Sequence, residues 1–345
     1  MKLDRRQFLG TTAVGIFLPS LALAQGKASG VLYEAAKKEG ELTWYIVHIT
    51  SETAEKIGRA FTEKYPGVKV NVVRTTAQVA FQRLNQDLQS KVANCDVFAS
   101  TDLGHYVDLK KRKLLMSYEP SNASEIDPRF RNVDPDNQFI ITSATFIAIL
   151  YNTDKVKAAD APKSWKELID PKWTNQVSVG HPGFSGFVGT WVVQMKKLYG
   201  WDYFKKLAAI KPQVGRSIID TVTATASGER SVAAGPGALA QYQASRGNPI
   251  GVSYPSEGSV LMASPSSIMA NAPHPNASKL FLEFLWGSEV ADITAAEFGT
   301  PLRPDTKVRP GVLPLDQMKT IRPSVEEVVT GIPEVTEDWR DLFGI

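Results

Sequence analysis

An alternation of short apolar strands with amphipathic helices constrains the fold of this 345-residue chain more than any other feature. A β-rich run at 42–47 is followed by a helical pattern at 51–65, and then by a second β-rich run at 68–73. A strand, a helix and a strand within about 35 residues form a βαβ unit of a parallel sheet. The same alternation recurs beyond residue 176, so we predict an α/β protein.

The length and two long extended segments predict two lobes. A chain of this size normally forms about two domains. The strand pattern at 139–150 is long enough to cross between lobes, and the extended pattern at 251–269 returns the chain to the first lobe. We expect two hinge strands joining two mostly parallel sheets flanked by helices. The expected limits are 25–145 plus 262–305 for lobe 1, 146–261 for lobe 2, and 306–345 for a C-terminal helical segment that packs on the lobes.

The first 24 residues have the pattern of a secretory signal. Arg5 and Arg6 precede a modest apolar run, and small residues at Ala22 and Ala24 provide a cleavage site after Ala24. The paired arginines favour the twin-arginine export route, with general secretion as the alternative. We expect a soluble, periplasmic mature protein. A single cysteine, Cys95, excludes an internal disulfide and a Cys-based metal cluster within one chain.

The charge balance excludes two classes of partner. After residue 24 the chain has 36 Lys and Arg against 35 Asp and Glu. A nearly neutral body gives no electrostatic basis for binding nucleic acid or anionic lipid.

Three strand-to-helix turns share one composition and mark a candidate site. Ligands of open parallel sheets collect at the carboxyl ends of the strands, where helix N-termini offer unpaired N–H groups to anions. Hydroxyl side chains there supply further donors, although each one could simply cap its helix. The candidates in these turns are His48, Thr50, Ser51, Thr101 and Ser185.

Further candidates lie outside the three turns. Arg216 lies between Gly215 and Ser217, and a guanidinium matches the geometry of a carboxylate or phosphate. The alternative is a surface arginine paired with Asp220. Ser143 and Thr145 alternate on one face of the long strand and either line a cleft or satisfy local backbone.

Signals of catalysis are weak. The turn at 183–187 lacks the last glycine of a nucleophile elbow, because Phe187 stands in its place. The four histidines show no metal-binding spacing. An exported enzyme therefore remains only an alternative, and we expect no cofactor.

Four motifs in order resemble the ferric-iron-type branch of bacterial periplasmic solute-binding proteins that serve ABC importers. They are His48 with the helix ending at 61–65, and the segments 95–102, 149–156 and 164–173. The resemblance implies a type II periplasmic-binding-protein fold, which traps a ligand between two lobes by hinge closure. Iron-binding members have adjacent tyrosines after the strand matching 232–234, where this chain has only Tyr242. They also tend to have an arginine on the first crossing strand, where this chain has Thr142-Ser143-Ala144-Thr145.

The resemblance and the residues together predict a non-enzymatic receptor for a small anionic organic solute of the carboxylate, phosphate or phosphonate type. Arg216 and Ser217 would hold the anion, and Tyr242 would stack on or hydrogen-bond the solute. The expected partner is a cognate ABC permease in the inner membrane, and we expect a monomer. The alternative within the same class is a ferric-iron receptor that binds through His48, Tyr242 and anions.

Overall fold

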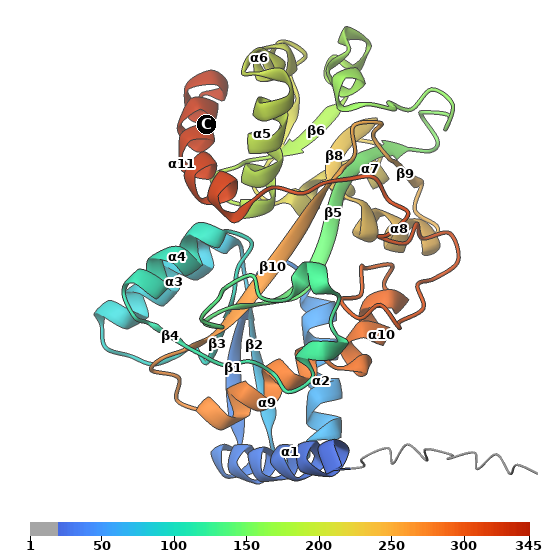
Figure 1. Ribbon diagram of the computed structural model, residues 1–345. Helices are drawn as coiled ribbons and strands as arrows, with labels where there is room; N and C mark the ends of the chain where they lie inside the picture. The colour runs from blue at the N-terminus through green and yellow to red at the C-terminus, as the bar shows by residue number, and fades with distance from the viewer. Residues whose placement is uncertain (1–19) are drawn as a thin grey trace, which may run out of the picture.

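Two lobes connected by two long strands form the molecule. The computed structural model describes residues 20–345, with side chains described from residue 30 onward. Strands β5 (Ile140–Asn152) and β10 (Ser259–Met269) run side by side between the lower lobe 1 and the upper lobe 2 (Figure 1). The predicted α/β architecture with two crossing strands is confirmed.

The strands follow the order β2-β1-β3-β10-β5-β8-β6-β7. In lobe 1, β1 pairs in parallel with β2 and β3, and in lobe 2, β6 pairs in parallel with β7 and β8. The crossing strands β10 and β5 are antiparallel to each other and to their neighbours β3 and β8. Two mostly parallel sheets are thus joined by an antiparallel pair. The remaining strands are β1 (Glu41–Ile46), β2 (Lys69–Arg74), β3 (Val97–Ala99), β4 (Leu115–Met116), β6 (Val177–Gly180), β7 (Gln213–Gly215), β8 (Val232–Pro236), β9 (Ile250–Ser253) and β11 (Thr320–Ile321).

Helices flank the sheet of each lobe (Figure 1). Lobe 1 contains α1 (Ser20–Glu39), α2 (Ser51–Lys64), α3 (Ala77–Gln89), α4 (Leu103–Lys111), α9 (Pro275–Leu285) and α10 (Ser288–Ala296). Lobe 2 contains α5 (Gly186–Tyr199), α6 (Asp202–Ala209), α7 (Ile218–Ala226) and α8 (Gly237–Ser245). The last helix, α11 (Val325–Phe343), follows a coil that crosses from lobe 1.

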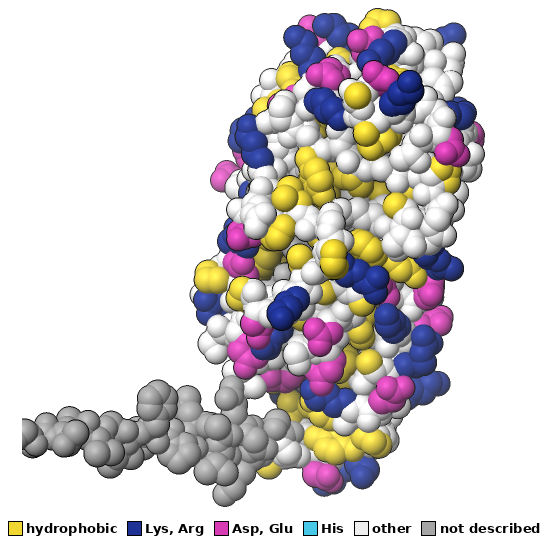
Figure 2. Space-filling model, turned by 90° about the vertical axis from the view of Figure 1, so that its right-hand side faces the viewer, with side chains coloured by type: hydrophobic (Ala, Val, Ile, Leu, Met, Phe, Trp, Pro, Cys, Tyr) yellow, Lys and Arg dark blue, Asp and Glu magenta, His cyan; other side chains and the backbone are white. Residues whose placement is uncertain are grey.

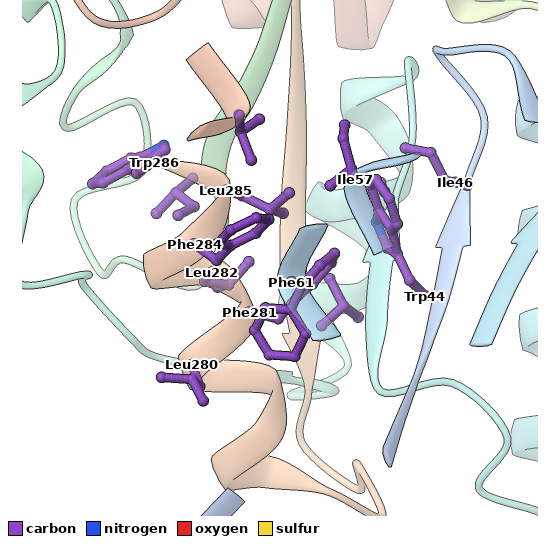
Figure 3. Packing of buried hydrophobic residues seen from close by; sticks show 14 of the residues in the cluster. Trp44, Ile46, Ile57, Phe61, Leu280, Phe281, Leu282, Phe284, Leu285 and Trp286 are labelled. Carbon is purple, nitrogen blue, oxygen red and sulfur yellow. The ribbon is translucent and has the colours of Figure 1, made fainter. Parts of the chain in front are cut away.

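Aromatic residues form the core of lobe 1. Trp44 of β1 and Phe61 of α2 each meet the ring of Phe281 of α9 edge to face, with ring centres 5.0 and 5.2 Å apart. Ile57 and Leu285 lie above this cluster (Figure 3). Each such side chain stabilises the fold by about 1.5–3 kcal/mol when fully buried. The helices α2 and α9 are therefore held firmly against β1.

The C-terminal helix α11 belongs to the core of lobe 2. Its Trp339 is fully buried and lies 5.8 Å from the ring of Phe204, edge to face. Lys196 of α5 pairs with Glu334 and Asp338 of α11 at 3.0 and 2.9 Å. The predicted lobe limits at 145/146 and 261/262 fall inside β5 and β10, where the two cores meet.

The predicted leader, 1–24, lies almost wholly outside the described residues, and its last five residues begin α1. Among the helices of the described chain, none has both the length and the apolar character needed to cross a bilayer.

Candidate ligand-binding cleft

The two lobes touch at the start of α5. A Cβ atom placed on Gly186 would lie 2.4 Å from the carbonyl oxygen of Thr101, in the β3–α4 turn of lobe 1. Only a residue without a side chain permits this approach. The lobes therefore meet at this point, and the structure is a closed form with a cleft between them.

Two adjoining cavities occupy the cleft. The main cavity measures about 130 Å³ and the smaller one about 30 Å³. They share the lining residues His48, Phe187, Ile218 and Ile219. His48 comes from lobe 1 and the other three from lobe 2, so both cavities exist only when the lobes meet.

Most of the sequence-predicted residues line these cavities. The main cavity is lined by His48, Thr50, Ser143, Thr145 and Tyr242. The smaller cavity is lined by His48, Thr101, Ser185 and Ser217. Two predicted residues, Ser51 and Arg216, line neither cavity and are exposed.

The hydroxyl residues of the turns also cap helices. Thr50 Oγ1 accepts a hydrogen bond from Thr53 N at 3.1 Å, and Ser217 Oγ accepts one from Ile219 N at 3.2 Å. Ser185 Oγ accepts from the backbone N–H of Val188 at 3.5 Å. The capping interpretation is therefore correct for these three residues, which also line the cavities, and their contact with a ligand stays a prediction.

Arg216 stands outside the cleft for a clear structural reason. Its guanidinium lies over the ring of Phe184, 4.7 Å from the centroid. Phe184 itself lines the smaller cavity, whereas Arg216 does not. The alternative pairing with Asp220 is not formed either, since that carboxylate accepts the backbone N–H of Ser217 at 2.9 Å in a capping box.

The sequence interpretation missed Arg74, which does line the smaller cavity. Arg74 is the last residue of β2 and is half-buried. Its Nε donates to the carbonyl oxygen of Ile49 at 3.1 Å, and its two terminal nitrogens have no hydrogen-bond partner in the described part of the chain. Burial lowers the pKa of Arg74, and Asp220 acts in the opposite direction. Because a guanidinium stays charged in proteins, Arg74 brings a positive charge to the lining of this cavity.

Two neighbours of Arg74 also have unmet hydrogen-bonding capacity. Burial, together with the nearby charge of Arg74, lowers the pKa of His48 to about 3, so its imidazole is neutral. The His48 Nδ1 and Thr76 Oγ1 atoms are buried, and neither has a hydrogen-bond partner within residues 20–345. Buried polar atoms without partners are rare in folded proteins, and here they surround one cavity.

The N-termini of three helices add positive potential around the same cavity. Thr76, Ser185 and Ser217 are the N-cap residues of α3, α5 and α7, and all three line it. Unpaired N–H groups at helix starts favour a bound anion. Arg74 could have been found from sequence, because it is the last residue of a strand that is soon followed by a helix. His48 lies in a similar position, two residues after the end of β1 and shortly before α2.

The described residues contain no group of three or more His, Cys, Asp or Glu side chains placed to hold a metal ion. Tyr242 lines the main cavity, and its Oη accepts a hydrogen bond from Arg246 at 3.3 Å. Because Arg246 lies one helical turn further along α8, the phenol is oriented by its own helix.

Comparison with known proteins identifies the family. Residues 94–322 match the family of bacterial extracellular solute-binding proteins, and the chain belongs to that family. A putative 2-aminoethylphosphonate-binding periplasmic protein of Salmonella typhimurium is 22% identical over 320 residues, which cover 88% of this chain and 89% of the relative.

Solved structures agree on the fold. The periplasmic binding protein AfuA from Actinobacillus pleuropneumoniae, with fructose-6-phosphate bound, superposes with a TM-score of 0.79 at 23% identity, covering 89% of this chain and 99% of AfuA. Iron-bound HitA from Pseudomonas aeruginosa superposes with a TM-score of 0.73 at 19% identity, covering 88% of this chain and 99% of HitA. The predicted type II fold and the predicted class, a solute-binding component of an ABC-type importer, are confirmed.

Proposed function

We propose that this protein captures a small organic anion between its lobes, with the anionic group in the smaller cavity. The observation that carries the proposal is the set of unmet polar groups there: the terminal nitrogens of Arg74, His48 Nδ1 and Thr76 Oγ1. A carboxylate, phosphate or phosphonate oxygen would accept from the guanidinium in a bidentate pair. A neutral His48 adds a directional hydrogen bond without adding charge.

Lobe closure completes the capture. Arg74, His48 and Thr76 come from lobe 1, and the N-termini of α5 and α7 come from lobe 2. The anion would therefore bind lobe 1 first and gain the helix N-termini when the lobes meet. The predicted roles of Thr101, Ser185 and Ser217 fit this arrangement, whereas Arg216 would act only by supporting Phe184.

The family supports a proposal for where the receptor works and to which partner it delivers its solute. The receptor would work in the periplasm after export and cleavage near Ala24, and would deliver its solute as a monomer to a cognate ABC permease. One relative is described as a putative 2-aminoethylphosphonate-binding periplasmic protein, and AfuA was solved with fructose-6-phosphate bound. Both of these compounds contain a phosphorus oxyanion. That common group supports an oxyanion as the recognised feature here, with no covalent chemistry.

Two variants test the proposal against the sequence prediction. A thermal-shift screen of organic carboxylates, phosphates and phosphonates identifies binders, because a ligand at about 100 times its Kd adds about 2.7 kcal/mol to folding. Titration calorimetry then compares Arg74→Gln with Arg216→Gln. Loss of a buried charged partner costs about 2–5 kcal/mol, so Arg74→Gln should weaken binding by about 30-fold or more. Arg216→Gln should change it by less than about threefold.

Two outcomes oppose this assignment. If Arg216→Gln caused the larger loss, the anion would lie at the outer turn that the sequence indicates. If adding ferric citrate gave a purple-red absorbance that Tyr242→Phe removed, the receptor would be an iron carrier.

A further inference from the structure

We propose that the solute of this receptor has a compact apolar body about the size of a benzene ring next to its anionic group. The inference rests on the proposed function, since it places the anion in the smaller cavity and the rest of the solute in the main cavity. It therefore favours an aryl or cyclic alkyl phosphonate, phosphate or carboxylate over a sugar phosphate.

Apolar side chains from both lobes form most of the main cavity wall. They include Trp44, Ile57, Phe187, Ile218, Leu239 and Leu285. Trp44, Ile57 and Leu285 also belong to the lobe 1 core, so this part of the wall is firmly packed (Figure 3). On the face with α8 and α10, hydrophobic side chains gather at mid-height between the more charged upper and lower parts (Figure 2).

Several polar side chains of the wall already bind one another. Thr142 Oγ1 lies 2.6 Å from Ser266 Oγ. Thr53 Oγ1 donates to Glu297 at 2.6 Å and lies 2.9 Å from Thr50 Oγ1. Glu297, the one acidic residue among those lining this cavity in the described chain, also pairs with Lys56 at 3.3 Å. These groups have little capacity left for a ligand.

Four polar groups of the wall have no side-chain hydrogen-bond partner within the described chain. They are the hydroxyls of Ser143, Thr145 and Thr294 and the buried Nε1 of Trp44. These groups cannot pair every donor and acceptor of the four or five hydroxyls of a hexose, and a buried polar group without a partner lowers affinity. An apolar body needs no partners and gains from leaving water.

The size of the main cavity defines the size of this body. A protein cavity of about 150 Å³ lined by aliphatic and aromatic side chains accommodates benzene, and the main cavity measures about 130 Å³. One six-membered ring or a branched chain of similar volume therefore fits.

Calorimetric titration of the full-length mature protein with matched probes tests the inference. The phosphorus series is phenylphosphonate, inorganic phosphate and glucose 6-phosphate, and the carboxylate series is benzoate, acetate and gluconate. In whichever series binds, we expect the aryl member to bind at least 10-fold more tightly than the other two. Its binding should also show a negative heat-capacity change, which marks burial of apolar surface.

A wall substitution gives an independent readout. Leu239 of α8 is only partly buried, so Leu239→Asn should fold. It should weaken the aryl probe at least fivefold and leave the inorganic or acetate probe unchanged. Leu198→Asn, at an exposed leucine on α5, is the matched control and should change neither.

The outcomes separate the inference from the function on which it rests. If the sugar acid bound most tightly and Arg74→Gln still abolished binding, the apolar body would be overturned and anion capture would stand. If no member of either series bound, or if Arg74→Gln had no effect on a bound probe, the proposed function itself would be overturned.

Discussion

The two lobes contribute different chemistry to one cleft. Three charged or titratable side chains of lobe 1 line the two cavities, namely Arg74, His48 and Glu297. Among the described lining residues of lobe 2, the phenol of Tyr242 is the one titratable group. Lobe 2 provides helix N-termini and apolar side chains, among them Phe187 and Leu239. Charge is thus fixed in lobe 1. Both lobes contribute apolar surface and helix N-termini, and closure brings those of lobe 2 over the charge.

This division suggests an order of events. An open receptor would still present the lobe 1 charges to solvent, where a small anion can find them. Closure then removes water and adds the α5 and α7 N-termini, which strengthens each polar contact in the enclosed site. Each prediction below separates a contribution of one lobe from that of the other.

The largest expected effect comes from blocking the contact between the lobes. Gly186→Val places side-chain atoms where Thr101 O lies, 2.4 Å from the position of the new Cβ. The lobes then cannot meet, although α5 itself can still form, because valine is acceptable at a first helical position. We expect solute affinity to fall at least about 100-fold, about 2.7 kcal/mol, in calorimetric titration.

A control and a second measurement complete this test. The control is Gly30→Val. A Cβ atom placed on Gly30 has no other heavy atom within 4 Å, so this substitution should leave affinity unchanged. Small-angle scattering should show ligand-induced compaction for the wild type and none for Gly186→Val. Normal compaction in the variant would mean that lobe 2 closes elsewhere, which would contradict the closed form described here.

The next largest effect concerns a carboxylate in lobe 1. Asp96 is fully buried and accepts hydrogen bonds from Thr43 N at 2.8 Å and from His274 N at 2.7 Å, with His274 Nδ1 2.9 Å away. Asp96→Asn removes the charge and turns one acceptor into a donor. We expect the free energy of unfolding to fall by about 2–3 kcal/mol, since hydrogen bonds to charged groups stabilise a fold more than neutral ones do.

Hydrogen exchange shows whether that loss stays within one lobe. Amides of β1, β3 and the first turn of α9 should lose protection in Asp96→Asn, while those of α5 and α7 should keep theirs. Equal loss in both lobes would mean that the shared sheet unfolds as one unit, and the lobes would then differ in chemistry but not in stability.

The sequence predicts the fold well because periodicity and turn composition are local. The βαβ pattern from residue 42, the long strand at 139–150 and the returning segment at 251–269 all correspond to observed elements. The extended segment divides into β9 and β10 around a turn at Pro255–Gly258. Such a break depends on pairing partners rather than on local pattern.

The site was only partly predictable because it depends on closure. His48 and Thr101 were found since they follow strands that end at the cleft. Arg74 obeys the same rule, but an arginine after a half-buried strand is also typical of a solvated end. Conversely, Arg216 looks isolated in sequence, and only the tertiary packing shows that its guanidinium lies over Phe184 and does not line the cavity.

A pH titration isolates His48 of lobe 1. The pKa of His48 is lowered to about 3 in the folded protein, mainly by burial, and is about 6.5 when unfolded. Below pH 6.5 the unfolded chain binds a proton that the folded chain does not, so stability falls as pH falls. This loss is about 1.2 kcal/mol between pH 6 and 5. His48→Gln should remove it, as measured by denaturant unfolding at each pH. Parallel curves for wild type and variant would show that His48 is hydrated.

The smallest effects distinguish backbone from side-chain recognition. Ser217 of lobe 2 caps α7 through its hydroxyl, so Ser217→Ala should cost about 1 kcal/mol of stability. It should change affinity less than threefold, because lobe 2 acts through main-chain N–H groups.

Thr76 of lobe 1 makes no capping bond, so Thr76→Ala should leave stability unchanged. It should weaken solute binding about fivefold, the value of one neutral hydrogen bond. Thermal unfolding and calorimetric titration of the two variants give both quantities. If Ser217→Ala lost affinity and Thr76→Ala lost only stability, the assignment of side-chain recognition to lobe 1 and main-chain recognition to lobe 2 would have to be exchanged.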